Sequence, residues 1–153
     1  MATLNQALQK ARAISKDALI SQFFDVIRSC EKEFIDKNKD QLLNEKIDIY
    51  GSPIGYYSRA TEAINPNKRA GTPFTLYDTG DFFSGFYMEI QNQSVKLYSR
   101  DSKTKDLVGA HLSRYSTFLS GDIFGLTDKN LREVIEQSIL PLFIQDIRTK
   151  LSI

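Results

Sequence analysis

The tripeptide Asp78-Thr79-Gly80 is the part of this sequence whose residue types most readily suggest catalytic chemistry. A carboxylate held in a tight turn can act as a general acid or base, and two such carboxylates placed together share one proton. A homodimer in which two Asp78 side chains meet would therefore possess the acid and the base that peptide hydrolysis requires. One interpretation of the motif is enzymatic.

Retroviral-type aspartic proteases carry the same tripeptide, and Ile123-Phe124-Gly125 is similar to their later apolar-apolar-glycine element. Two features favour a different interpretation. The residue after Gly80 is the charged Asp81, which would place a further carboxylate beside the pair. Helical patterns also flank the motif on both sides, whereas those enzymes consist almost entirely of β-strands. A protease-like homodimer using Asp78 is kept as an alternative, because a three-residue motif needs its structural context.

The other interpretation of the motif is structural. Thr79 caps a short turn with its hydroxyl, Gly80 lets the backbone pass where a side chain would clash, and Asp81 complements the positive end of the turn. Phe82 and Phe86 then return the chain to the core. In this interpretation the tripeptide turns the backbone and has no catalytic role.

Other catalytic or metal-binding arrangements find little support. A metal at Asp78 and Asp81 would lack ligands, because the nearest further acid is Glu89 and hard cations need more oxygen atoms. His111 is the only histidine, and neither a nucleophile-elbow pattern nor a glycine-rich phosphate-binding loop is present. We therefore expect no catalytic residue, no metal site and no cofactor.

A basic cluster lies in the middle of the chain. Arg59, Lys68 and Arg69 accompany three tyrosines, and such residues can contact phosphates and stack on bases. Three cations give only a modest electrostatic attraction, so a solvated loop tip is an equally good explanation. A nucleic-acid-binding adaptor that uses this loop is the second alternative.

Composition sets the broad class of the protein. The 153 residues fit one domain, and a formal net charge of +1 gives no general attraction to nucleic acid or anionic membranes. Cys30 is the only cysteine, so no intramolecular disulfide can form. No window holds the ~18 apolar residues needed to cross a bilayer. We expect a single soluble domain over residues 1–153, without a membrane partner.

Two amphipathic helices are predicted from apolar residues that recur at three- and four-residue spacing. The first spans about residues 15–37. The second spans residues 127–151, with Thr127 as its N-cap and Pro141 as the point where it must kink or rearrange. Residues 1–14 are compatible with a short helix and are predicted to form an N-terminal arm.

Between the helices, the sequence predicts a loop followed by a sheet. Residues 47–72 contain prolines, glycines and tyrosines and are predicted to form an ordered extended loop. Residues 73–126 form the sheet region, in which FYMEI and VKLYS pair as a hairpin turned at Gln91-Asn92-Gln93-Ser94. The fold class is therefore α+β, with an antiparallel sheet packed against long N-terminal and C-terminal helices.

A longer pattern connects these elements to a known family. Leu76, Thr79, Gly80 and Phe82 form a Leu-x-x-Thr-Gly-x-Phe element that opens the sheet region, and Phe124, Gly125, Leu126, Thr127 and Asp128 precede the last helix. Over about residues 47–153 this combination resembles the virion morphogenesis, or tail-completion, proteins of tailed phages. Two features depart from that pattern. Gly109-Ala110-His111 is a loose echo of a longer family motif, and residues 50–72 hold no motif that can be assigned.

The resemblance implies a non-enzymatic virion protein, assembled in the host cytoplasm and located at the head–tail junction as a neck, connector or tail-completion component. It implies a ring-shaped homo-oligomer that contacts portal, connector or tail proteins, with DNA passing through the ring without sequence-specific binding. Tyrosine and arginine are favoured at protein interfaces. We therefore expect the interface to include Tyr56, Tyr57, Arg59, Lys68 and Arg69.

Overall fold

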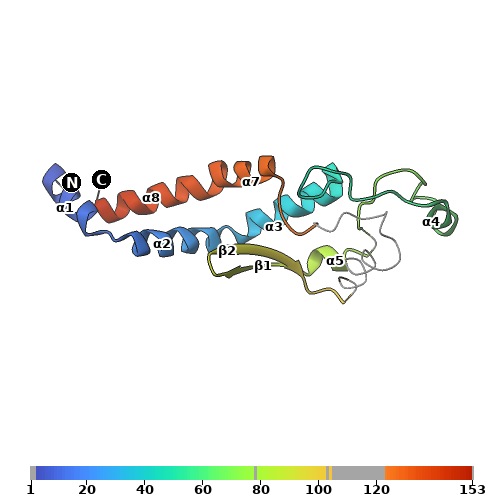
Figure 1. Ribbon diagram of the computed structural model, residues 1–153, viewed down its shortest axis with the longest axis horizontal. Coiled ribbons are helices and arrows are strands. Elements are labelled where there is room, and N and C mark those ends of the chain that lie inside the picture. Colours follow the sequence, from blue (N-terminus) through green and yellow to red (C-terminus); the bar gives the residue numbers. More distant parts are fainter. Residues whose placement is uncertain (1–2, 78, 103, 105–122, 153) are drawn as a thin grey trace.

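The structure, a computed structural model, describes residues 3–77, 79–102, 104 and 123–152. Two long helical segments run side by side along the molecule, a hairpin lies below one of them, and a loop with a short helix forms one end (Figure 1). This arrangement confirms the predicted α+β class, with an antiparallel sheet and long N-terminal and C-terminal helices.

The N-terminal helical segment is longer than predicted. It consists of α2 (Lys16–Ser29), α3 (Glu31–Asp40) and a π-helical turn η1 (Gln41–Glu45). Cys30 separates α2 from α3, although its amide still donates to the carbonyl oxygens of Val26 and Ile27. The segment continues past residue 37 because its next buried positions are Asn38 and Gln41, two amides that an apolar pattern cannot reveal.

The C-terminal helical segment is divided by a second π-helical turn. It comprises α7 (Asp128–Val134), η2 (Ile135–Ile139) and α8 (Leu140–Leu151). Thr127 is the N-cap, as predicted, and its side chain accepts a hydrogen bond from the Asn130 amide. The predicted rearrangement near Pro141 is also confirmed: the widened turn ends immediately before the proline, and the Leu140 amide donates to the Ile135 carbonyl.

The hairpin pairs β1 (Phe86–Gln91) with β2 (Ser94–Ser99). The pairing confirms the predicted hairpin, and the register places Met88 opposite Leu97 and Ile90 opposite Val95, which brings these apolar residues together. The two central turn residues, Asn92 and Gln93, have φ angles of 48° and 61°. Two left-handed residues in a two-residue loop are the signature of a type I′ turn, whose twist matches that of the strands.

The described residues form two apolar core clusters. The first lies among α2, α3, the hairpin and the C-terminal segment; its buried members are Val26, Ile27, Cys30, Phe34, Leu97, Val134 and Ile139. The second lies where the hairpin, η1 and the loop regions meet; its buried members are Leu42, Ile54, Phe82, Phe83, Phe86 and Ile123. The hairpin therefore packs against α2 and α3, in agreement with the predicted packing of the sheet on the N-terminal helix.

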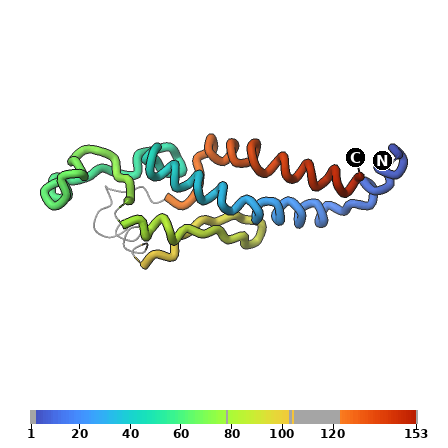
Figure 2. Tube along the Cα trace, turned by 180° about the vertical axis from the view of Figure 1, so that it is seen from behind, coloured from blue at the N-terminus to red at the C-terminus, as the bar shows by residue number. Residues whose placement is uncertain are grey.

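The predicted N-terminal arm contains helix α1 (Leu4–Ala13). Thr3 and Gln6 form a capping box at its start, and Ala7 is buried. Lys10 Nζ donates to Ser152 Oγ at 2.5 Å, which joins α1 to the end of α8. Both ends of the chain therefore lie at the end of the molecule that is remote from α4 (Arg59–Ile64) (Figure 2).

Candidate functional site

The threonine-glycine motif lies at the start of a short helix, α5 (Asp81–Ser84). Asp78 itself lies outside the described residues. The Thr79 hydroxyl donates to Asp81 Oδ2 at 2.6 Å, whereas α5 has no side-chain cap, so the predicted capping role of Thr79 is wrong. Thr79 instead orients the carboxylate of Asp81, which stands in the first turn of the helix.

Gly80 is the N-cap of α5 and has a φ of 91°. A Cβ atom at this position would lie 3.4 Å from the Tyr77 hydroxyl oxygen, which is ordinary contact. The predicted clash is therefore not the reason for glycine. The positive φ is the reason, because side chains other than asparagine and aspartate rarely adopt it.

The phenylalanines after the motif anchor this turn in the second apolar cluster. Phe82 and Phe83 are buried, and the ring of Phe82 lies edge-on to that of Phe86 with centroids 5.1 Å apart. Leu76 packs against the same cluster with a φ of 55°. Among the described residues, the motif therefore has a structural role.

The Phe-Gly-Leu-Thr-Asp motif is held by amides from the N-terminal helical segment. Asn38 Nδ2 donates to the carbonyl oxygens of Ile123 and Gly125, at 3.1 and 2.6 Å. Gln41 Nε2 donates to the Gly125 carbonyl at 3.2 Å, and Gln41 Oε1 accepts from the Thr127 amide at 2.9 Å. Two completely buried amides thus fix the entry to α7 on α3 and η1.

The remaining motif residues extend this attachment. Phe124 contacts Phe82 and Phe86, with ring centroids 5.9 and 5.6 Å apart, and it packs against both apolar clusters. Leu126 packs against the first cluster, while Asp128 is exposed in the first turn of α7. The motif therefore connects the two clusters and starts the last helix.

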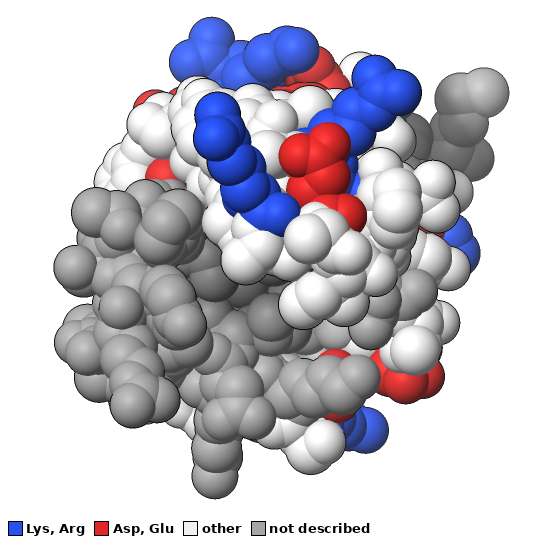
Figure 3. Space-filling model, turned by 90° about the vertical axis from the view of Figure 1, so that its right-hand side faces the viewer, with Lys and Arg blue, Asp and Glu red and all other residues white. Residues whose placement is uncertain are grey.

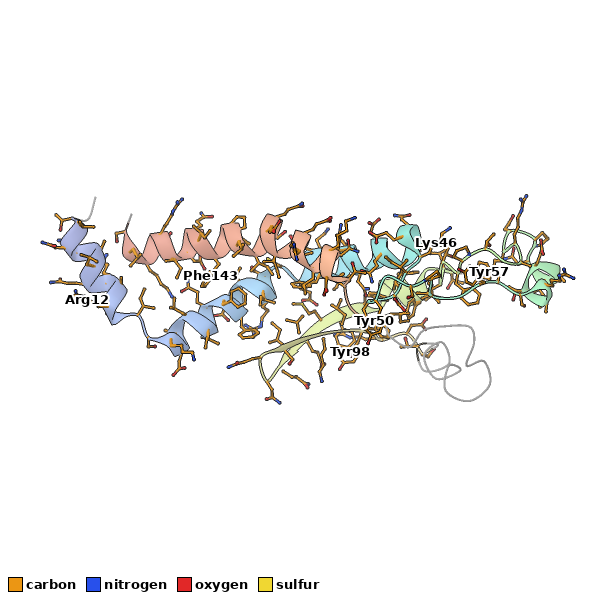
Figure 4. The ribbon with its side chains drawn as sticks, turned by 45° about the horizontal axis from the view of Figure 1, so that its top comes forward. Arg12, Lys46, Tyr50, Tyr57, Tyr98 and Phe143 are labelled. Atoms are coloured by element: carbon orange, nitrogen blue, oxygen red, sulfur yellow. The ribbon has the colours of Figure 1, made fainter. Side chains whose placement is uncertain are left out.

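The candidate interface residues lie on a projection that we call the arm, residues 55–74. Its two sides are joined by backbone hydrogen bonds: Tyr57 N to Thr72 O at 3.0 Å, Gly71 N to Tyr57 O at 2.9 Å and Phe74 N to Gly55 O at 2.9 Å. Helix α4 forms its tip, and no residue of α4 is buried. The arm reaches away from the rest of the molecule (Figure 4).

The base of the arm is attached to the core of the protein. Ile54, directly before it, is completely buried in the second cluster. Asp48 Oδ1 accepts hydrogen bonds from the amides of Tyr50 and Ser52, both at 2.9 Å, which closes a tight turn beside the arm. The backbone that leads into the arm is therefore fixed by core packing and by hydrogen bonds.

The two candidate tyrosines have different surroundings. Tyr56 is 47% exposed. Tyr57 is half-buried: its ring lies edge-on to that of Phe74 at a centroid distance of 4.7 Å, and its hydroxyl lies 3.2 Å from Thr75 Oγ1. Tyr57 thus holds the two sides of the arm together, and Tyr56 is the tyrosine that a partner can reach.

The candidate basic residues gather near the tip. Arg59 begins α4 and is exposed, Arg69 is also exposed, and Lys68 is half-buried. Ala70 N donates to Glu62 Oε2 at 3.3 Å, which joins α4 to the returning side of the arm. Figure 3 views the molecule from this end and shows several Lys and Arg side chains over its upper part, with Asp and Glu side chains beside them and further basic side chains at the right-hand and lower edges.

Sequence reasoning missed one exposed apolar residue, Ile64, and it did not assign Tyr50, one of the three tyrosines of the predicted loop, to the interface. Ile64, the last residue of α4, is 86% exposed, and Tyr50, beside the base of the arm, is 74% exposed. Ile64 could have been noticed because it stands alone among polar and small residues, with no apolar neighbour at helical spacing. The helix that carries it was not predicted at all.

The described residues hold few features typical of a catalytic or metal centre. No group of three or more His, Cys, Asp or Glu side chains that could bind a metal occurs among them. A groove of about 310 Å³ lies between α2, α3, the hairpin and the C-terminal segment, and every side chain that lines it is apolar. Burial raises the pKa of the Cys30 thiol, which makes this thiol less reactive.

One ion pair joins the two long helical segments. Lys37 Nζ donates to Glu133 Oε2 at 2.5 Å. The hydrogen bond from Lys37 lowers the pKa of the Glu133 carboxyl, and the same contact raises the pKa of Lys37. The pair bridges α3 and α7, so its effect is to hold the helices together.

Comparisons with protein-family models, with curated proteins and with solved structures gave no match. Within the part of the chain that the structure describes, no helix is long and apolar enough to cross a membrane.

Proposed function

We propose that this protein is a structural virion subunit of a tailed phage or prophage, located at the head–tail junction as a neck, connector or tail-completion component. It acts through ring assembly and through contacts with portal, connector or tail proteins. The structure of the arm is the main support for this proposal. The arm projects from the molecule with Tyr56 and Ile64 exposed to solvent, and no residue of α4, its tip, is buried.

Ordering an exposed segment costs conformational entropy, about 1–2 kcal/mol for the backbone of each residue. The arm recovers part of this through its own hydrogen bonds, but α4 adds nothing to either apolar cluster. A surface on another protein would supply the missing burial. Subunits of a ring need two different patches that meet head to tail, and a projecting arm provides one of them.

The two family-like motifs also support the proposal. The threonine-glycine turn anchors phenylalanines in the core, and the Phe-Gly-Leu-Thr-Asp segment is clamped to the N-terminal helices. These are structural roles, which agree with a protein that works by assembly rather than by catalysis.

The decisive experiment removes the tip of the arm. Residues 58–70 are replaced by a short Gly-Ser linker, which leaves the buried Ile54 in place. We expect the variant to keep its helical circular dichroism and its melting behaviour and to fail to enter particles. A variant that enters particles normally, or one that unfolds, contradicts the proposal.

Point variants refine this test. Tyr56→Ala combined with Ile64→Ser should reduce incorporation, because both side chains are exposed and neither supports the core. The matched control is Arg12→Glu, an exposed residue of α1 at the opposite end of the molecule (Figure 4). Equal losses in both variants would show that the arm has no special part in assembly.

The two alternatives give distinct results. A protease-like homodimer predicts peptidase activity that is lost in Asp78→Asn, whereas the structural role predicts that this variant folds and assembles nearly normally. A nucleic-acid adaptor predicts DNA binding that weakens with salt and with charge reversal at Arg59 or Arg69. Peptidase activity or salt-sensitive DNA binding in the wild-type protein would contradict the proposed function and support the corresponding alternative.

A further inference from the structure

An exposed stripe runs along the C-terminal helical segment. Its members are Glu136, Leu140, Ile144 and Arg148, each four residues from the next. All four are exposed, and the two apolar residues are 39% and 47% exposed. Residues spaced by four form a continuous ridge on a helix, and the π-helical turn that carries Glu136 keeps it nearly above Leu140.

Within the described chain, nothing covers this ridge. Helix α8 has no buried residue, although half of its length is apolar. The C-terminal segment forms one long edge of the molecule, and both views show the described chain only on its other side (Figures 1 and 2). An apolar helix face in this position is typical of an interface.

The charges at the two ends of the ridge identify the partner. Glu136 is acidic, Arg148 is basic, and the two apolar residues lie between them. Neither charged side chain forms an ion pair with another described residue. When two copies of the ridge lie antiparallel, Leu140 faces Ile144 of the other copy and Glu136 faces Arg148 of the other copy. The pattern is therefore complementary to itself.

We propose that two copies of this chain pair through this ridge, with α8 antiparallel to α8 of the second copy around a two-fold axis between Leu140 and Ile144. A two-fold interface uses the same patch on both subunits, so every favourable contact occurs twice. Two apolar pairs lie at the centre, and two ion pairs close the ends. This dimer is formed by the free chain and does not rest on the role proposed above.

The test is sedimentation equilibrium of the purified full chain. The wild type shows a monomer–dimer equilibrium, and Ile144→Glu is monomeric at the same concentrations. Glu136→Arg and Arg148→Glu each replace two attractions by two repulsions, which raises the dissociation constant by about tenfold. The double variant, with both changes, restores the ion pairs in reverse and returns the dissociation constant to near the wild-type value.

Asp146→Arg is the matched control, because it makes the same charge change on the same helix but off the ridge. It leaves the dissociation constant unchanged. Circular dichroism checks the fold of each variant, and the exposed charge variants test the idea even if Ile144→Glu does not fold. A wild type that stays monomeric, single variants without effect, or a double variant that stays weak would each overturn the proposal. A parallel pairing of the two ridges would also leave the single variants without effect, because each charged residue would face its own copy before and after the change.

Discussion

Asn38 and Gly125 are 87 residues apart in the chain, yet the side-chain amide of Asn38 donates to the Gly125 carbonyl at 2.6 Å. The same Nδ2 atom also donates to the Ile123 carbonyl at 3.1 Å. Because Asn38 is completely buried, water cannot replace these bonds. This contact joins α3 to the segment that leads into the last helix.

Asn38→Leu should therefore destabilise the fold by about 1–3 kcal/mol, because it removes the side-chain donor of the Ile123 carbonyl and leaves the Gly125 carbonyl with Gln41 as its remaining side-chain donor. The change is measured as a shift in the midpoint of urea unfolding. Asn44→Leu provides the control, since Asn44 is exposed and bonds only to Asp40. Equal effects of the two changes would mean that the clamp contributes nothing specific.

Gly80→Val should be damaging, whereas Gly80→Asn should be tolerated. A Cβ atom has room at this position, so the cost comes from the φ of 91° alone. Asparagine adopts left-handed backbone conformations far more readily than a β-branched residue. Thermal melting of both variants gives the comparison. If both lose the same stability, space rather than backbone conformation limits the position.

Ile139→Ala should cost about 2–5 kcal/mol, because its side chain is 1% exposed in the first cluster. Leu131→Ala should cost less than about 2 kcal/mol, because Leu131 is 37% exposed and keeps part of its contact with water in the folded state. Urea unfolding of the two variants would reveal the difference. A reversed order would show that the C-terminal segment packs differently in solution.

The Lys37–Glu133 pair should make stability depend on pH. The pKa of Glu133 is lowered by the hydrogen bond from Lys37, so its contribution is present above the ordinary pKa of glutamate and lost as the pH falls through the lowered value. The pKa of Lys37 is raised, so its contribution is present below the ordinary pKa of lysine and lost as the pH rises through the raised value.

The free energy of unfolding should therefore differ most between wild type and Glu133→Gln near neutral pH, and the difference should disappear in acid. Unfolding curves over a range of pH measure it. Asp146→Asn, a carboxylate off this contact, should leave the pH profile unchanged. A constant difference between wild type and Glu133→Gln at every pH would exclude the electrostatic explanation.

The elements that could be predicted are those whose buried side is apolar. Ile27 and Phe34 reveal the first helix, and Met88 and Ile90 reveal the hairpin, because burial repeats with the period of the structure. The first helix was ended too early for the same reason. Beyond residue 37 its buried side begins with two amides, Asn38 and Gln41, that are satisfied by a segment far away in the chain, and Leu42 follows them.

The candidate site was harder to predict because its properties depend on distant parts of the chain. The need for glycine at position 80 was anticipated, but the cause was wrong, since a φ angle is not visible in a sequence. Tyr56 and Tyr57 have the same side chain and adjacent positions, yet Tyr57 packs on Phe74 inside the arm. Helix α4 has no buried side and therefore no periodic pattern.

The contact between Lys10 and Ser152 brings the two ends of the chain together, on the side of the molecule away from the arm. A short peptide could therefore join them, and new ends could be opened in the turn at Asn92 and Gln93, where both side chains are exposed. A circular permutant of this kind would keep both core clusters. A fluorescent protein fused at the original ends would likewise stand clear of α4, so the protein could be labelled without covering the tip of the arm.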